Sequence, residues 1–169
     1  MRFQISVICF LFGILGLMGC AHYQVGTSAK VSFVTLYVEP VESETLLPQA
    51  RAIISTQLRE AFAQDGRVTV VNSPDNADAT LHLTLKDYRR EMVSALETDT
   101  GLARKFILTL DVACTLSPKV GPDLFTDRMV RIQRDAFTDG GQLQSEYQTL
   151  PLLAEELSRK IVHTVLDVW

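Results

Sequence analysis

The cysteine at position 20 is the residue of this chain with the clearest chemistry. It closes the run Leu17-Met18-Gly19-Cys20, which follows a single positive charge, Arg2, and an uncharged apolar stretch from Ile5 to Met18. A short cationic segment, an apolar segment and a small residue before the cut are typical of a secretory signal peptide. The stretch is shorter than the roughly 20 apolar residues that a spanning helix needs. Because a thiol at the cut can take a diacylglyceryl group, we predict a lipoprotein signal over residues 1–19.

Lipid attached at Cys20 would fix where the protein works. Cleavage exposes a new N-terminus for a further acyl chain, and two or more chains hold a protein at a membrane where one binds only marginally. We therefore expect a lipid anchor at Cys20, a tether over residues 20–30 and no membrane span. Ala21 stands where some enteric bacteria use aspartate to retain lipoproteins at the inner membrane, so we expect the periplasmic side of the outer membrane. In the alternative interpretation, the signal is an ordinary secretory one and the cysteine is coincidental.

The other reactive residues do not make a catalytic or metal site. The histidines His22, His82 and His163 lack metal-ligand spacing, and the sequence contains no HExxH, CxxC or GxSxG pattern. Asp139-Gly140-Gly141 lacks the lysine and the further glycines of a phosphate-binding loop, which favours a turn. Cys114 lies in an alternating apolar run, so we predict a small buried core residue. We expect no enzymatic activity, no cofactor and no metal.

Two basic pairs, Arg89-Arg90 and Arg104-Lys105, flank an acidic turn region from Glu97 to Gly101. A hairpin ending at this turn would bring four positive charges together. Such a cluster could hold the phosphates of an anionic glycolipid by charge-assisted hydrogen bonds. In the alternative interpretation, the pairs lie on a solvated hairpin and have cross-strand partners in Glu91 and the acidic residues of the turn.

Size and charge limit the remaining classes of function. Without residues 1–19 the chain keeps 150 residues, which is enough for one compact domain. Fifteen basic and twenty acidic residues then remain, a formal charge of −5. Since binding to duplex nucleic acid requires a basic surface, this balance argues against nucleic acid as a partner.

Hydrophobic periodicity predicts the order strand, helix, four strands, helix within a single domain over residues 31–169. The proline Pro48 opens the first helix and Asp65-Gly66 ends it, whereas Pro151 is expected to open the last helix, which runs to about Val168. The predicted strands cover residues 31–38, 68–71, 80–88, 106–116 and 124–137. The last of these carries Arg128, Arg131 and Arg134 with weak alternation, so we expect an edge strand or a strand with a ragged end.

One apolar stripe on each helix and one apolar face on the sheet predict the fold class. We expect an α+β two-layer sandwich, with two helices packed on one face of a mixed, mostly antiparallel four- to five-stranded sheet. The predicted core residues are Ile54, Leu58, Leu83, Leu110, Leu157 and Ile161.

In combination these features resemble the LptE-like family, the lipopolysaccharide-assembly lipoproteins of the outer membrane. The resemblance covers essentially the whole mature chain and rests on the order of elements more than on single letters. It includes the aromatic run from Cys20 to Gly26, the segment Gln57-Leu58-Arg59, and an arginine-bearing strand over residues 128–137. The segment Arg104 to Val112 is similar to the central strand of the family, with Phe106 in the usual place of a tyrosine.

The resemblance implies a non-catalytic plug inside the large outer-membrane β-barrel of the lipopolysaccharide translocon, which such lipoproteins also help to fold. It implies lipopolysaccharide as a further ligand, and it makes Arg89, Arg90, Arg104 and Lys105 candidate contacts for the barrel or the glycolipid. The acidic tip from Glu97 to Thr100 departs from a family that often has a basic residue there. The Tol-like lipoproteins and the activators of peptidoglycan synthases share much of the pattern, and they would act by binding other proteins.

Overall fold

The computed structural model describes residues 31–96, 99–137 and 142–167. The predicted signal peptide, the tether and Cys20 lie outside the described residues. The elements in chain order are β1 (Thr35–Val38), β2 (Glu42–Ser43), α2 (Pro48–Asp65), β3 (Thr69–Val71), the short 3₁₀ helix η1 (Pro74–Asn76), β4 (Ala79–Leu96), β5 (Asp99–Pro118), β6 (Phe125–Phe137) and α3 (Gln142–Leu166).

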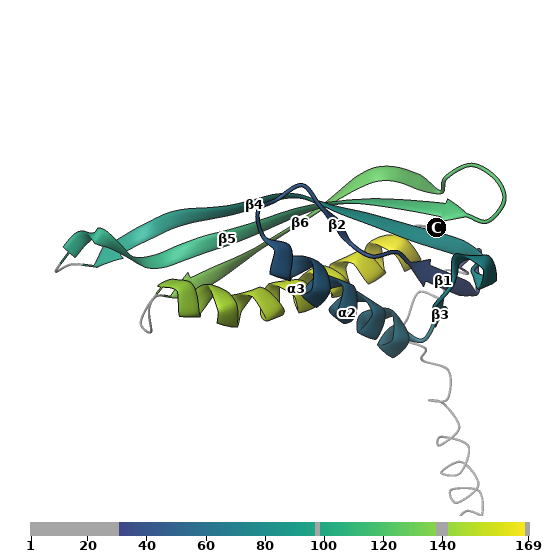
Figure 1. Ribbon diagram of the computed structural model, residues 1–169, viewed down its shortest axis with the longest axis horizontal. Coiled ribbons are helices and arrows are strands. Elements are labelled where there is room, and N and C mark those ends of the chain that lie inside the picture. Colours follow the sequence, from purple (N-terminus) through teal and green to yellow (C-terminus); the bar gives the residue numbers. More distant parts are fainter. Residues whose placement is uncertain (1–30, 97–98, 138–141, 168–169) are drawn as a thin grey trace, which may run out of the picture.

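The strands form one mixed sheet in the order β3-β1-β4-β5-β6, with β2 paired to β4 off this path. The strand β1 runs parallel to β3 and β4, whereas β4, β5 and β6 pair antiparallel in sequence order. Both helices lie on one face of the sheet (Figure 1). The α+β two-layer prediction is confirmed, with six strands in place of four to five, because the two-residue strand β2 is too short to give a periodic signal.

Helix α2 has the predicted bounds because both of its ends are encoded locally. Pro48 occupies the first turn, where a missing N–H costs no intrahelical hydrogen bond. At the other end Gly66 adopts a φ of 74°, and its N–H donates to the carbonyl of Phe62 at 3.2 Å. Glycine reaches this left-handed conformation without the steric cost that a Cβ would bring.

Helix α3 begins at Gln142, nine residues before the predicted start at Pro151, so that prediction was wrong. A proline inside a helix removes one backbone hydrogen bond and is usually avoided there. Here Pro151 is exposed, while the neighbouring Leu150 and Leu153 are buried. Packing of the apolar stripe against the sheet therefore continues the helix through the proline.

Strands β4 and β5 are also longer than predicted, with 18 and 20 residues. Their pairing shifts register between Leu85 and Asp87, and again between Met92 and Leu96. Each shift moves the side chains that follow it out of the period-two alternation, although the strands remain paired. The alternation is therefore lost before the strands end, and the hairpin is longer than the alternation predicts (Figure 1).

The core lies between the helices and the sheet face they cover. All six predicted core residues are fully buried, which confirms the predicted helix stripes and sheet face. Cys114 is also buried in this layer, as predicted, and burial raises the pKa of its thiol to about 12. A thiol with such a pKa is not a nucleophile at neutral pH.

Candidate interaction face

The sheet face opposite the helices, here called the outer face, contains buried polar residues although no helix covers it. Alternation along the central strand β5 places Thr109 and Asp111 on this face and Leu108 and Leu110 against the helices. Thr109 is 1% exposed and Asp111 is 4% exposed. Long side chains from the neighbouring strands must therefore cover these two residues.

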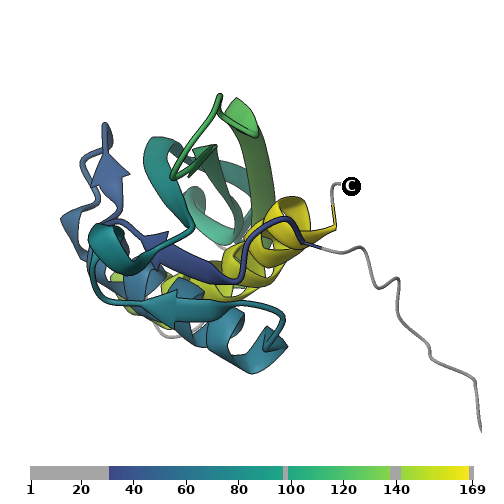
Figure 2. The same ribbon diagram turned by 90° about the vertical axis from the view of Figure 1, so that its right-hand side faces the viewer.

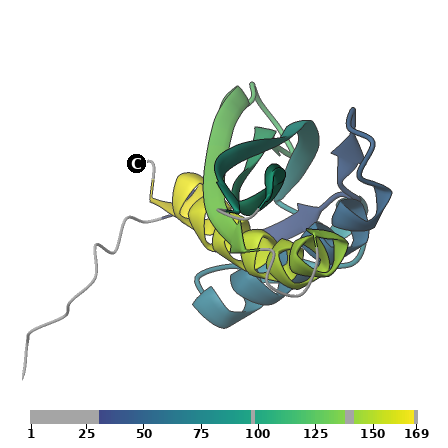
Figure 3. The same ribbon diagram turned by 90° about the vertical axis from the view of Figure 1, so that its left-hand side faces the viewer.

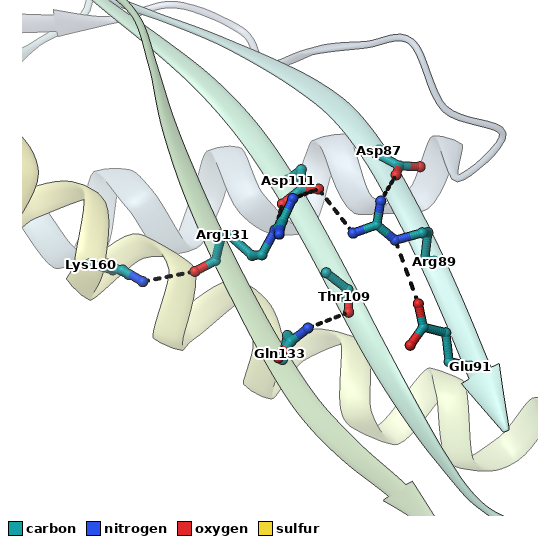
Figure 4. Close-up of polar contacts among 8 residues, drawn as sticks. All are labelled: Asp87, Arg89, Glu91, Thr109, Asp111, Arg131, Gln133 and Lys160. Carbon is teal, nitrogen blue, oxygen red and sulfur yellow. Dashed lines mark hydrogen bonds and ion pairs between the residues drawn. The ribbon is translucent and has the colours of Figure 1, made fainter. Parts of the chain in front are cut away.

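Asp111 is held by arginines from both neighbouring strands (Figure 4). Arg131 of β6 donates from Nε to Oδ1 at 2.6 Å and from Nη2 to Oδ2 at 3.0 Å. Arg89 of β4 approaches Oδ2 from the other side at 3.4 Å. The bidentate hydrogen bond from Arg131 lowers the pKa of Asp111 below its ordinary value, although burial acts in the opposite direction. This carboxylate is ionised at neutral pH.

The ion pairs continue along β4. Arg89 contacts Asp87 at 2.6 Å and lies 3.8 Å from Glu91. We call Asp87, Arg89, Asp111 and Arg131 the charge ladder, because each has an opposite charge within the group. Next to it, Gln133 donates to the hydroxyl of Thr109 at 3.2 Å. This part of the outer face is therefore polar, and its ladder charges compensate one another.

A shallow groove of about 480 Å³ lies beside the charge ladder on β5 and β6. It is lined by Ile107, Gln133, Arg134, Asp135 and Phe137. The groove thus combines apolar and polar side chains on one open surface.

The four basic candidates do not lie at the end of the hairpin, so that part of the expectation was wrong. Arg89 and Arg90 pair with Thr109 and Leu108, whereas Lys105 pairs with Ser94. Along β5 the nearest of these positions, Leu108 and Lys105, are three residues apart, roughly 10 Å at the usual rise per residue. The reason is that β4 continues to Leu96 and does not end at the arginines.

The candidates also differ in direction and partners. Arg89 belongs to the charge ladder on the outer face. Arg90 points the other way, with its guanidinium carbon 5.4 Å from the ring centre of the buried Phe106. Lys105 pairs with Asp135 at 2.8 Å. Arg104 lies in β5, but its side chain is outside the described ones. For Arg89 and Lys105, the interpretation as a hairpin with cross-strand acidic partners fits best, and their role as binding contacts stays a prediction.

Sequence reasoning missed Asp111, the centre of this face. The available signal was an acid in the middle of a mostly apolar strand, with arginines at every third position of the next strand. Only the register between β5 and β6, which pairs Asp111 with Arg131, turns that signal into a contact.

No group of three or more His, Cys, Asp or Glu side chains within the described ranges could hold a metal ion. Among the described helices, none is both long and apolar enough to cross a membrane. Every buried side-chain N or O atom of the described residues has a hydrogen-bond partner.

Solved structures with this arrangement include bacterial lipoproteins. A minor lipoprotein from Acinetobacter baumannii matches with a TM-score of 0.54 at 18% identity, over 79% of this chain and 92% of that one. Lipoprotein B from Nitrosomonas europaea matches with a TM-score of 0.52 at 18% identity, over 86% and 88%. A protein from Xanthomonas campestris reaches 0.62 at 11% identity, over 81% and 85%. At such identities the likeness shows a shared fold alone.

The family is given by the sequence. Residues 33–165 match the family LptE, described as lipopolysaccharide-assembly, and the chain therefore belongs to this family. The predicted resemblance is confirmed. A search of the curated proteins found no match.

Proposed function

We propose that this protein is an outer-membrane lipoprotein that assists lipopolysaccharide assembly as a non-catalytic plug of a large β-barrel. Membership of the LptE family supports the role in assembly. The polar outer face, centred on the ion pair between Asp111 and Arg131, is the observation that carries the plug role. A plug acts by binding, which requires no catalytic residues.

A barrel lumen and this outer face match in chemistry. Barrels with many strands enclose an open space, and the interior of outer-membrane barrels is polar. A domain that fills such a lumen must present polar groups without burying uncompensated charge, since an isolated charge out of water is very costly. The charge ladder meets this condition because its carboxylates and guanidinium groups already neutralise one another. Specificity would then come from hydrogen bonds and charge placement more than from apolar area.

The shape of the described domain also suits a plug. It is elongated along the strands (Figure 1), and its cross-section is compact when it is seen from either end (Figures 2 and 3). Strand β1 lies at the end opposite the tip of the β4–β5 hairpin. A tether over residues 20–30 would span at most about 35–40 Å when fully extended. Lipid on Cys20 would therefore keep the β1 end near the membrane, and the hairpin would point away from the anchor.

Affinity purification tests the partner. The full-length protein, tagged at its C-terminus, is isolated from detergent-solubilised membranes of its native host. We expect a large integral β-barrel protein to copurify in near-equal amount, recognised by gel migration that changes on heating. Copurification of a peptidoglycan synthase or a Tol component in its place would overturn the proposal and favour the Tol-like or synthase-activator class.

Intact mass tests the anchor. We expect acyl mass on Cys20 of the wild-type protein and none on the Cys20→Ser variant, which lacks the thiol for the thioether bond. Equal mass corrections in both proteins would contradict lipid attachment at this residue. Recovery of the wild-type protein mainly from the inner-membrane fraction would contradict the outer-membrane location.

A further inference from the structure

The sheet has two long outer edges along its antiparallel strands, and helix α3 covers one of them. Lys160 of α3 donates to the backbone carbonyl of Arg131 on β6 at 2.8 Å (Figure 4). Near one end of β6, Arg128 donates to the carbonyl of Thr164 at 3.4 Å, and towards the other end Arg134 pairs with Glu156. Side chains between α3 and β6 therefore occupy the edge where another strand could pair.

The edge of β4 is different. On the side away from β5, β4 pairs with β1 up to Leu81 and with β2 up to Leu85. The N–H of Glu44 still donates to the carbonyl of Leu85 at 2.9 Å, and the Glu44 carboxylate holds Lys86. Beyond this point the described strands give β4 no second neighbour, although the strand continues to Leu96. An open edge of this kind leaves a row of backbone N–H and C=O groups for another chain to pair with.

This open edge lacks several of the usual means of protection. Residues 86–96 contain no proline, and the pairing with β5 is regular from Asp87 to Met92. On the outer face its charges, Asp87, Arg89 and Glu91, alternate in sign, so they do not repel all partners as a run of lysines would. Large apolar side chains are also exposed here: Met92 and Val93 lie on the strand, and Leu46 lies just beyond the last residue that pairs with it.

We propose that the open edge of β4, over residues 87–93, accepts an extended segment of the barrel partner as an added strand. In this mode backbone hydrogen bonds provide affinity, and alternate side chains provide specificity. On the outer face the segment would oppose Asp87, Arg89 and Glu91, which favours residues of complementary charge. On the other face of the strand, Met92 favours an apolar neighbour. The identity of the partner rests on the proposed function, whereas the site itself rests on the topology of the sheet.

In every register centred on residues 86–91, a second copy of this chain fits the edge poorly. Two identical edges related by a two-fold axis pair antiparallel, so one residue lies opposite itself. A register centred on Arg89 opposes Arg89 to Arg89 and Asp87 to Glu91, and one centred on Tyr88 opposes Lys86 to Arg90. Every other register centred from residue 86 to 91 places a charged residue against its own copy. Like charges directly opposite each other destabilise a strand pair.

Hydrogen exchange tests the added strand directly, because the new contacts are backbone hydrogen bonds. Exchange is followed by mass spectrometry on the lipidated protein alone and in its native membrane complex. We expect amides within residues 87–93 to exchange at least about tenfold more slowly in the complex. The edge of β6, residues 125–137, serves as the internal control, since α3 already covers it and its exchange should change little.

A pair of variants sharpens the test. Consecutive strand residues direct their amides to opposite sides, so only one of Glu91→Pro and Met92→Pro removes an amide that faces the open edge. The variant that keeps the wild-type melting temperature should lose the partner during purification. If it keeps the partner, or if residues 87–93 show no slower exchange in a complex that contains the barrel, the added strand is wrong and the plug proposal stands. If residues 87–93 exchange more slowly in a complex whose partner is not a barrel, the plug proposal alone is overturned. If their protection grows with protein concentration in the absence of a partner, the edge pairs with a second copy of this chain and not with a partner segment.

Discussion

The two faces of strand β5 are buried to similar extents by different chemistry. Towards the helices, Leu108, Leu110 and Val112 pack in an apolar layer. On the outer face, Thr109 and Asp111 are as inaccessible as the leucines, but a hydroxyl and a carboxylate are buried there under side chains from β4 and β6. The comparison shows that burial alone does not identify a hydrophobic core, since one strand of this sheet is buried by two layers of opposite character.

The two layers are expected to contribute differently to the free energy of folding. Apolar burial stabilises in proportion to the area removed from water. A buried ion pair gains Coulomb energy but loses hydration, so its net contribution is small, whereas removal of one partner is costly. The inner layer therefore supplies stability. The outer layer fixes the position of charges on a surface that we assign to binding.

The inner layer should give the largest loss of stability. Leu157→Ala removes a fully buried side chain of α3, and the lost burial together with the cavity should lower the free energy of unfolding by about 2–5 kcal/mol. Urea denaturation measures this loss. Leu152→Ala on the same helix is the matched control, because Leu152 is exposed and should cost less than about 1 kcal/mol. A loss below about 0.5 kcal/mol for Leu157→Ala would mean that this helix face is not in the core.

The outer layer should give the second largest loss of stability. Asp111→Asn keeps the shape of the side chain but removes the charge between Arg89 and Arg131, so we expect a loss of about 1–3 kcal/mol at pH 7. Asp135→Asn is the control, since that carboxylate forms an exposed pair with Lys105, and such pairs contribute about 0–1 kcal/mol. Equal losses for the two variants in urea denaturation would show that the charge ladder is no different from an ordinary surface pair.

The same variant predicts a dependence on pH. The pKa of Asp111 is lower in the folded protein than its ordinary value, so the unfolded state takes up the proton first as the pH falls. The stability that the carboxylate contributes is therefore complete above about pH 5 and disappears as the pH falls below about 4 and through the folded pKa. The difference in unfolding free energy between wild type and Asp111→Asn should be constant from neutral pH to about 5 and then shrink. A difference that persists unchanged at about pH 2 would contradict an ionised, hydrogen-bonded Asp111.

The smallest effect is expected from the neutral pair beside the ladder. Gln133→Ala leaves the buried hydroxyl of Thr109 without its side-chain donor and should cost about 0.5–1.5 kcal/mol. Thr109→Val combined with Gln133→Ala removes both partners, so it should recover part of this loss. If the double variant is less stable than the single one by the full cost of a second lost interaction, the two side chains are not coupled.

The sequence predicts what is encoded locally and misses what depends on pairing between strands. Helix α2 is correct at both ends because Pro48 and Gly66 mark them in the sequence. The predicted start of α3 is wrong because tertiary packing outweighs the local preference of Pro151 for the first turn of a helix. The charge ladder requires the register of three strands, which the alternation of any one strand does not contain. For the same reason the four basic candidates could be found by type but could not be placed.

Photo-crosslinking in native membranes shows directly whether this domain lies inside a barrel. A crosslinker replaces Met129, which lies on the outer face opposite Ala113 and is exposed, and a second replaces Asp99 at the start of β5 near the hairpin tip. If the outer face and the hairpin lie inside a large outer-membrane barrel, both positions should capture the same integral β-barrel protein. Repeated capture of a peptidoglycan synthase or a Tol component at these positions would contradict the plug role and favour the activator class.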